Sequence, residues 1–399
     1  MTTTPLPDHL RMPHLRPIQP IGLQKDGKQF VALRDPQMLC KQTMVIPVQA
    51  MPVLQFFRGE EDLDAIAQRL KAPVEQLAAL VQGLDQVGLL WGPTFERLER
   101  ELKEEIATRG AYPMGAAGSL GESAEQCRKR LDAWLAETDD PELDEPVRGL
   151  VAPHLDYERG WPNYAAAYRC IERVERPDRI VILGTNHFGL GDGVVLAEHG
   201  FETPLGRVSS DVGIVSAMIE RLGKPLIIDQ LDHMPEHSVQ LHLPWLQHRW
   251  GDVPMVAALV PDPLAPMVEE DGERVTGERF VETLREVLDA AGGRTFFIAS
   301  ADLSHVGPQF GEPRPVDDQR RHDVELHDRE MMAKFLTGDA EEFLGAMRWC
   351  NNPTRWCSVG NMSAALMLAR PAGVELIDYR QAVDEQGMVL VSSAAMAMF

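Results

Sequence analysis

RGLVAPHLDY (148–157), RIVILGTNH (179–187) and RTFFIASADLSH (294–305) are the stretches that decide the fold. Each begins as a short apolar run, typical of a buried strand, and ends in polar residues that include a histidine. Further strand-like runs are VPMVAALV (253–260) and MVLVSSAAMAMF (388–399), and the helical patterns between them cover residues 163–175, 209–222, 277–291 and 359–369. Strands alternating with helices predict an α/β domain with a mainly parallel sheet sandwiched by helices.

The polar ends of these strands hold the first candidate site residues. In an open α/β sheet the ligand crevice lies at the carboxyl ends of the strands. We therefore expect His154, His187, Asp302 and His305 to converge if their strands are neighbours. One such histidine alone could equally cap a helix or bind a carbonyl, but three strand-terminal histidines in one domain favour a metal pocket.

A second cluster lies in DHMPEHSVQLHLPWLQH (232–248), which supplies Glu236, His237 and His242. The histidines are five residues apart, so they do not share a helix face and do not form an HExxH zinc helix. We expect Glu236 and His237 at a helix N-terminus, with His242 about one and a half turns later. The alternative is an amphipathic helix that carries histidines on its polar face.

Cys357 is the third kind of candidate ligand. It lies in NNPTRWCSVGNMSAALM (351–367), just before an apolar helical pattern. A helix N-terminus favours the thiolate, and thiolate with imidazole suits iron, copper or zinc. The alternative is a half-buried structural cysteine.

Composition excludes several classes of partner. The 399 residues carry a formal net charge of −22, which disfavours nucleic acid and anionic membranes as partners. The N-terminal residues lack the apolar core of a signal peptide, and no apolar run is long enough to span a membrane. Five scattered cysteines argue against a disulfide framework and predict a reducing, cytoplasmic location.

The chain before the α/β domain divides into two predicted parts. Residues 1–95 combine a strand-like run at 27–36 with two short helical patterns, which predicts a small winged-helix-like α+β module. This module resembles the PqqD-like domains that hold leader peptides. Residues 96–146 are charged and helical and end in the proline-marked run DDPELDEP, so we expect a connector there. The metal-binding domain then spans 147–399.

A set of motifs in this domain resembles the Memo family, whose prokaryotic members are called AmmeMemoRadiSam system protein B. The motifs are APHLDY, LGTNH, TPLGRVSSD, EHSVQLHLPWLQ, ASADLSHVG and CSVGNMSAAL, in that order. The resemblance implies a class III extradiol dioxygenase-like fold. It also implies metal ligation by His154, His187 and Cys357, with the cysteine where the dioxygenases have a carboxylate. The first motif departs from the family's usual pattern, because Asp156 and Arg159 enter a stretch of small residues.

The resemblance further implies roles for the remaining candidates, all of which we expect in or around the pocket. His305 matches the dioxygenase acid/base histidine, with Asp302 beside it, and Glu236, His237 and His242 match a second element. We expect Fe(II) or copper, or alternatively zinc, in an open site. The functions to weigh are a metal-dependent oxidoreductase acting on a small molecule or peptide, a zinc-dependent hydrolase or lyase, and a non-enzymatic metal or peptide carrier for a radical-SAM partner.

Overall fold

The computed structural model describes residues 6–40, 42–187, 193–265 and 274–399. The chain forms two compact units, Met1–Arg109 and Gly110–Phe399. This division falls inside the segment 96–146 that the sequence presents as a connector. Among the described helices, none is both long and apolar enough to cross a membrane.

The first unit is an α+β fold with its own core. A three-stranded antiparallel sheet runs in the order β1 (Gln19–Lys25), β2 (Lys28–Arg34) and β3 (Met44–Pro47). The helices are α1 (Asp8–Arg11), α2 (Met51–Leu54), α3 (Leu63–Leu70), α4 (Val74–Gln86) and α5 (Pro93–Arg109). The Asp62 side chain caps α3 by accepting a hydrogen bond from the Asp64 amide, as expected of an acidic residue at a helix start. Leucines, valines and isoleucines from β2, β3, α3 and α4 form the core.

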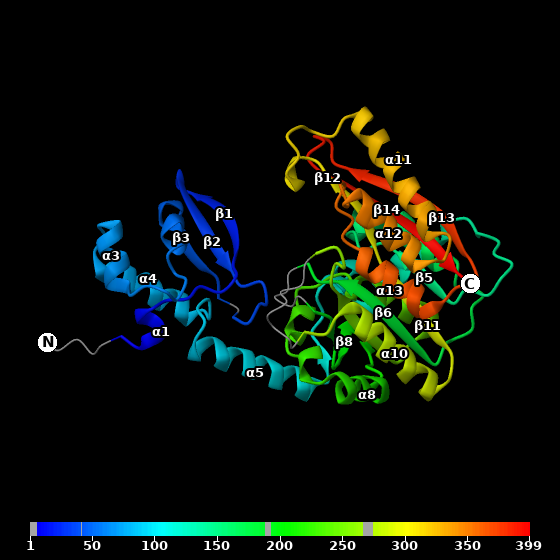
Figure 1. The fold of residues 1–399 in the computed structure, drawn as a ribbon, viewed down its shortest axis with the longest axis horizontal. Helices are drawn as coiled ribbons and strands as arrows, with labels where there is room; N and C mark the ends of the chain where they lie inside the picture. The colour runs from blue at the N-terminus through cyan, green and yellow to red at the C-terminus, as the bar shows by residue number, and fades with distance from the viewer. Residues whose placement is uncertain (1–5, 41, 188–192, 266–273) are drawn as a thin grey trace. The chain divides into compact units, whose positions relative to one another are not determined.

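The second unit is built on an eight-stranded sheet (Figure 1). The strands run in the order β12 (Asp302–Val306), β14 (Leu390–Met398), β5 (Gly149–Ala152), β11 (Thr295–Ser300), β6 (Arg179–Thr185), β10 (Met255–Val260) and β7 (Val195–Leu196), and β13 (Val374–Val383) pairs with β14. The central strands β5, β11, β6 and β10 are parallel, and the pairings outside them are antiparallel. The predicted α/β architecture is therefore confirmed, with antiparallel margins that the local patterns did not indicate.

Helices cover both faces of this sheet. On one face α13 (Val359–Ala369) lies against β6, β10 and β11 and is flanked by α10 (Gly277–Ala291) and α12 (Ala340–Cys350); α8 (Val212–Leu222) packs on α10, and α11 (Asp318–Phe335) packs on α12 and β12. On the other face α7 (Tyr157–Arg169) lies against β5, β13 and β14, with α6 (Ala124–Ala136) and α9 (Leu243–Trp250) beyond it. A small separate sheet joins β4 (Ala111–Tyr112), β8 (Gly200–Thr203) and β9 (Gly206–Val208). The central strands are buried on both sides, which explains their nearly continuous apolar sequences.

Two local expectations were wrong. RTFFIASADLSH is not one strand that ends in histidine. β11 stops at Ser300, and Asp302 begins a separate strand, β12. β12 pairs antiparallel with β14, which lies two positions from β11 in the sheet. Glu236 and His237 do not begin a helix either. They lie in an irregular segment, and α9 starts only at Leu243, with His242 as its N-cap residue. In both places long-range packing overrides the local pattern.

Candidate metal centre

The carboxyl ends of neighbouring strands bring two histidines together. His154 follows β5 and His187 follows β6, and both strands pair with β11. The two imidazole rings are 5.0 Å apart between centroids and nearly perpendicular. Cys357 approaches from the start of α13, and one ligand atom from each of the three residues lies within 4.8 Å of the others. The structure therefore unites the residues that the sequence proposed as metal ligands.

A hydroxyl group determines which nitrogen of His154 faces the cluster. Ser300 Oγ donates its one proton to the carbonyl of Ser238 at 2.6 Å. The same oxygen lies 3.1 Å from His154 Nδ1, so it accepts the proton of that nitrogen. His154 Nε2 then carries the lone pair, and it lies 3.3 Å from Cys357 Sγ. The buried imidazole is thus fixed in the tautomer that can bind a metal through Nε2.

His187 is oriented in a similar way by a buried carboxylate. Glu236 accepts the backbone N–H of His187 at 2.8 Å, and His187 Nδ1 lies 3.2 Å from each carboxylate oxygen. The same carboxylate accepts the Ser238 amide and lies 3.3 Å from His237 Nδ1. Gly184 makes room for this segment, because a Cβ there would lie 2.5 Å from Ser238 Oγ. Glu236 therefore acts as an anchor, and the close group His187, Glu236 and His237 adjoins the His–Cys cluster.

The spacing of the donor atoms fits a shared metal ion. Metal–nitrogen and metal–sulfur bonds of about 2.0 and 2.3 Å place two ligands of a tetrahedral ion about 3.6 Å apart. The distance from His154 Nε2 to Cys357 Sγ is close to this value. Two imidazoles and one thiolate leave coordination positions open, which is characteristic of a catalytic rather than a purely structural centre.

Burial and hydrogen bonding separate the proton affinities of the two histidines. Burial, with His187 and His237 close by, holds the pKa of His154 well below its usual value. Burial also lowers the pKa of His187, but hydrogen bonds to Cys357 and Glu236 outweigh it and raise that pKa well above the usual value. Burial opposes ionisation of Glu236, yet the bonds from His187 bring its pKa to about 2. Glu236 is therefore ionised near neutral pH, beside the cluster.

Asp302 and His305 lie at the cluster on β12. Asp302 Oδ1 accepts the amide of His154 at 3.0 Å, and Oδ2 lies 3.7 Å from His154 Nε2. Burial raises the pKa of Asp302 to about 7, so this carboxyl can hold or release a proton near neutrality. His305 Nδ1 lies 3.0 Å from the Leu303 carbonyl, to which it donates, so its Nε2 is the basic nitrogen. Burial lowers the pKa of His305 to about 4.

His242 does not join this group. Its ring packs against Tyr164 and Tyr168, and Nδ1 lies 2.8 Å from the Tyr168 hydroxyl. It is completely buried. The spacing from His237 gave no sign of this separation, because the helix that was expected to carry both residues does not form.

The sequence reasoning missed several supporting residues. Asp328 on α11 is fully buried and accepts hydrogen bonds from Ser304, Trp356, Tyr379 and Ser392. Ser304 precedes His305 and Trp356 precedes Cys357, so this one carboxylate ties both site segments to the sheet. Asn361 on α13 donates to the Ser300 carbonyl and to Thr185 Oγ1. Nothing in the local sequence signalled this role of Asp328, because its partners come from distant segments of the chain.

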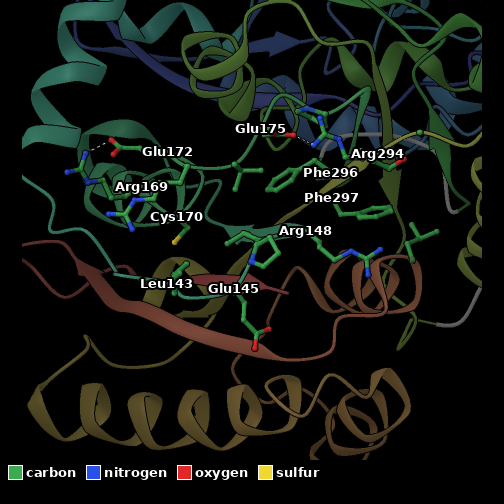
Figure 2. Close-up of a pocket in the computed structure, with 18 of the residues that line it drawn as sticks. Leu143, Glu145, Arg148, Arg169, Cys170, Glu172, Glu175, Arg294, Phe296 and Phe297 are labelled. Atoms are coloured by element: carbon green, nitrogen blue, oxygen red, sulfur yellow. Dashed lines mark hydrogen bonds and ion pairs between the residues drawn. The ribbon is translucent and has the colours of Figure 1, made fainter.

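A different cavity, of about 550 Å³, lies at the amino ends of β5 and β11 (Figure 2). Arg148, which precedes β5, and Thr295, which begins β11, are on its wall. Figure 2 shows two of its arginines already paired, Arg169 with Glu172 and Arg294 with Glu175. None of the proposed ligands lines this cavity.

Comparisons with known proteins agree with the motifs. A family model described as Memo-like protein matches residues 113–398. A MEMO1 family protein of Thermus thermophilus is 28% identical over 331 residues, which cover 82% of this chain and 94% of that protein. One from Methanopyrus kandleri is 30% identical over 263 residues, or 63% of this chain and 82% of that protein. One from Aquifex aeolicus is 25% identical over 367 residues, covering 90% and 92% respectively. With 90% of the chain covered, similarity continues before residue 113.

Proposed function

Because this chain belongs to the Memo-like protein family, we propose that His154, His187 and Cys357 hold a redox metal, iron(II) or copper, and that the protein is a metal-dependent oxidoreductase. The observation that carries the proposal is the fixed tautomer of His154, whose unprotonated Nε2 faces Cys357 Sγ. A histidine that served only for packing would need no such orientation. A bound redox metal with open positions would supply activation of dioxygen or a related oxidant.

The chain's own residues would manage protons in this chemistry. His305 is unprotonated near neutrality and presents Nε2 because Nδ1 donates to a backbone carbonyl, so Nε2 is the atom that would accept a proton from a substrate hydroxyl or thiol. Asp302, with its pKa of about 7, is suited to exchange a proton beside His154. Glu236 and Ser300 keep the two ligand imidazoles in place. The substrate in this proposal is a small molecule or peptide, and the sparse cysteines fit a reducing cytoplasm.

The test is metal analysis after anaerobic purification. Wild type should retain iron or copper, and both His154→Ala and Cys357→Ala should lose it. His322→Ala, on an exposed position of α11, and Cys350→Ala, on α12, are matched controls that should keep it. Zinc in the wild type would favour a hydrolase that uses zinc-activated water. Metal content that neither ligand variant changes would refute the shared centre.

A peptide partner is a second candidate function for the first unit. All seven residues of β1, an edge strand, are exposed, and Ile21 and Leu23 are 42% and 44% exposed on one face with Val45 at 50%. Such an edge can pair with an extended peptide. We propose a substrate peptide or a radical-SAM partner as its occupant, in keeping with the PqqD-like pattern. The double variant Ile21→Lys, Leu23→Lys should abolish capture of that partner, and capture at the wild-type level would remove this idea.

A further inference from the structure

One face of α7 is lined with aromatic rings. Tyr157, Trp161, Tyr164 and Tyr168 follow the spacing that puts residues on the same side of a helix. Two rings from other helices meet this face, Trp134 of α6 and Trp245 of α9. Three of the five tyrosines of the chain lie on this one helix.

Most of these rings form an ordered stack. The Trp245 ring lies 5.9 Å from that of Tyr164 and 5.2 Å from that of Tyr168, tilted by only 5° and 8°. Trp134 stacks on Trp245 at 5.9 Å, and Trp161 stacks on Trp134 at 5.8 Å. Tyr164 and Trp245 are buried, whereas Trp134 and Trp161 are partly exposed. The stack therefore leads from the interior to the surface in steps shorter than 6 Å.

The inner end of the stack approaches the metal centre. The Tyr164 hydroxyl donates to the Leu155 carbonyl at 3.2 Å, and Leu155 directly follows the ligand His154. One hydrogen bond and a short length of backbone thus separate the first ring from the cluster. Edge-to-face packing is common for aromatic pairs in protein cores, but here four connected pairs are stacked, and the two that involve tyrosines both branch from Trp245.

A proton acceptor stands beside the stack. The Tyr168 hydroxyl lies 2.8 Å from His242 Nδ1, and both residues are buried. Burial lowers the pKa of His242 to about 3, so the imidazole is neutral, and in the tautomer that is protonated at Nε2 its Nδ1 accepts the hydroxyl proton of Tyr168. In the described part of the chain neither His242 Nε2 nor Trp245 Nε1 has a hydrogen-bond partner. The phenol therefore has a place to deposit its proton, while Trp245 has none.

We propose that these rings form an electron relay between the surface and the metal centre, in which oxidation of Tyr168 is coupled to proton transfer to His242. The relay rests on the proposed redox function. The stack would give one electron to a one-electron oxidant held in the pocket, such as an oxidised metal ion. Tyr168 then loses one electron to oxidised Trp245, and its proton moves to His242, which leaves a neutral tyrosyl radical and an imidazolium. A one-electron reductant at the surface, such as a thiol or a reduced flavin, returns the electron through Trp161 and Trp134, and the proton goes back to Tyr168.

Flash photolysis of the metal-free full chain tests the relay without the metal. Photogenerated tris(bipyridine)ruthenium(III) oxidises surface rings, and electron paramagnetic resonance records any tyrosyl radical. Wild type should give this radical, and Tyr168→Phe should lose it. His242→Gln and Trp161→Phe should reduce its yield. Trp349→Phe, which replaces a 90% exposed ring on α12 outside the stack, should leave it unchanged.

The outcomes are separable from those of the metal analysis. Each variant's thermal unfolding and metal content are measured alongside, and Trp161→Phe changes a partly exposed ring with little risk to folding. A tyrosyl yield that is unchanged in Tyr168→Phe, or lost only in Trp349→Phe, would overturn the relay even if the metal site is intact. Loss of metal in the ligand variants with no radical in wild type would retain the metal site and reject the relay.

Discussion

Strands β5 and β11 end in two very different regions. Beyond their carboxyl ends lies a cluster of histidines, a cysteine and carboxylates, and residues at their amino ends, Arg148 and Thr295, line the 550 Å³ cavity of Figure 2. The cavity is open and rich in arginines, but its walls pair Arg169, Arg173 and Arg294 with carboxylates. In the cluster, hydrogen bonds go to the outer nitrogens of the imidazoles and leave the inner nitrogen of His154 facing sulfur. The two regions thus differ in the placement of protons as well as in volume, and the proposed metal centre is marked by the first.

The largest expected effect comes from the sulfur ligand. Cys357→Ala should leave the protein folded and without stoichiometric metal, because two imidazoles alone bind a divalent ion weakly. The measurement is metal content after equilibrium dialysis. Arg148→Ala, at the amino end, is the matched change and should not alter metal content. An equal loss of metal in both variants would show that the two ends of the sheet do not differ in metal binding.

Low pH should lower the free energy of unfolding through the buried histidines of the fold. Burial lowers the pKa of His233 to about 4 and that of His242 to about 3. Between these values and about 6.5 the unfolded chain binds protons that the folded chain does not, so stability falls as the pH falls through this window. Each such group contributes a slope of roughly 1.4 kcal/mol per pH unit. Denaturant unfolding between pH 7 and 4 measures the total slope, and His242→Gln should lower it by about the contribution of one group.

The residues that orient the ligands should have intermediate effects. Ser300→Ala removes the acceptor for His154 Nδ1, and Glu236→Gln weakens the hold on His187. Each should lower metal affinity by about 10- to 100-fold while leaving the ligands in place. Competitive chelator titration gives the affinity. Ser300→Thr, which keeps the hydroxyl, should recover part of the metal affinity. No recovery would mean that Ser300 acts through packing and not through the tautomer of His154.

The smallest effect is expected at the arginine-lined cavity. Arg294→Ala removes an exposed ion pair with Glu175, and exposed pairs contribute about 1 kcal/mol or less. Its change in unfolding free energy should be correspondingly small and should shrink further in high salt. A change in metal affinity with this variant would show that the two ends of the sheet are coupled.

The parts that could be read from the sequence are those set by local pattern. Apolar runs located β5, β6, β10, β11 and β14, and the residues after β5 and β6 supplied His154 and His187. The division of residues 294–305 into β11 and β12 was not readable, because β12 is held by β14, almost ninety residues later in the chain. The same limit applies to Ser300 and Asp328. Their importance lies in partners that folding brings from distant segments, and neither residue type stands out locally.

The position of β14 also has a consequence for how the molecule is made. This strand is buried along its whole length and lies between β12 and β5, although it follows both in the chain. During synthesis, one edge of β5 therefore stays unpaired until residues 390–398 have been made. An unpaired apolar strand edge is prone to form non-native strand pairs. β14 is therefore the strand that completes the sheet, because it fills the position between β12 and β5 after both have been synthesised.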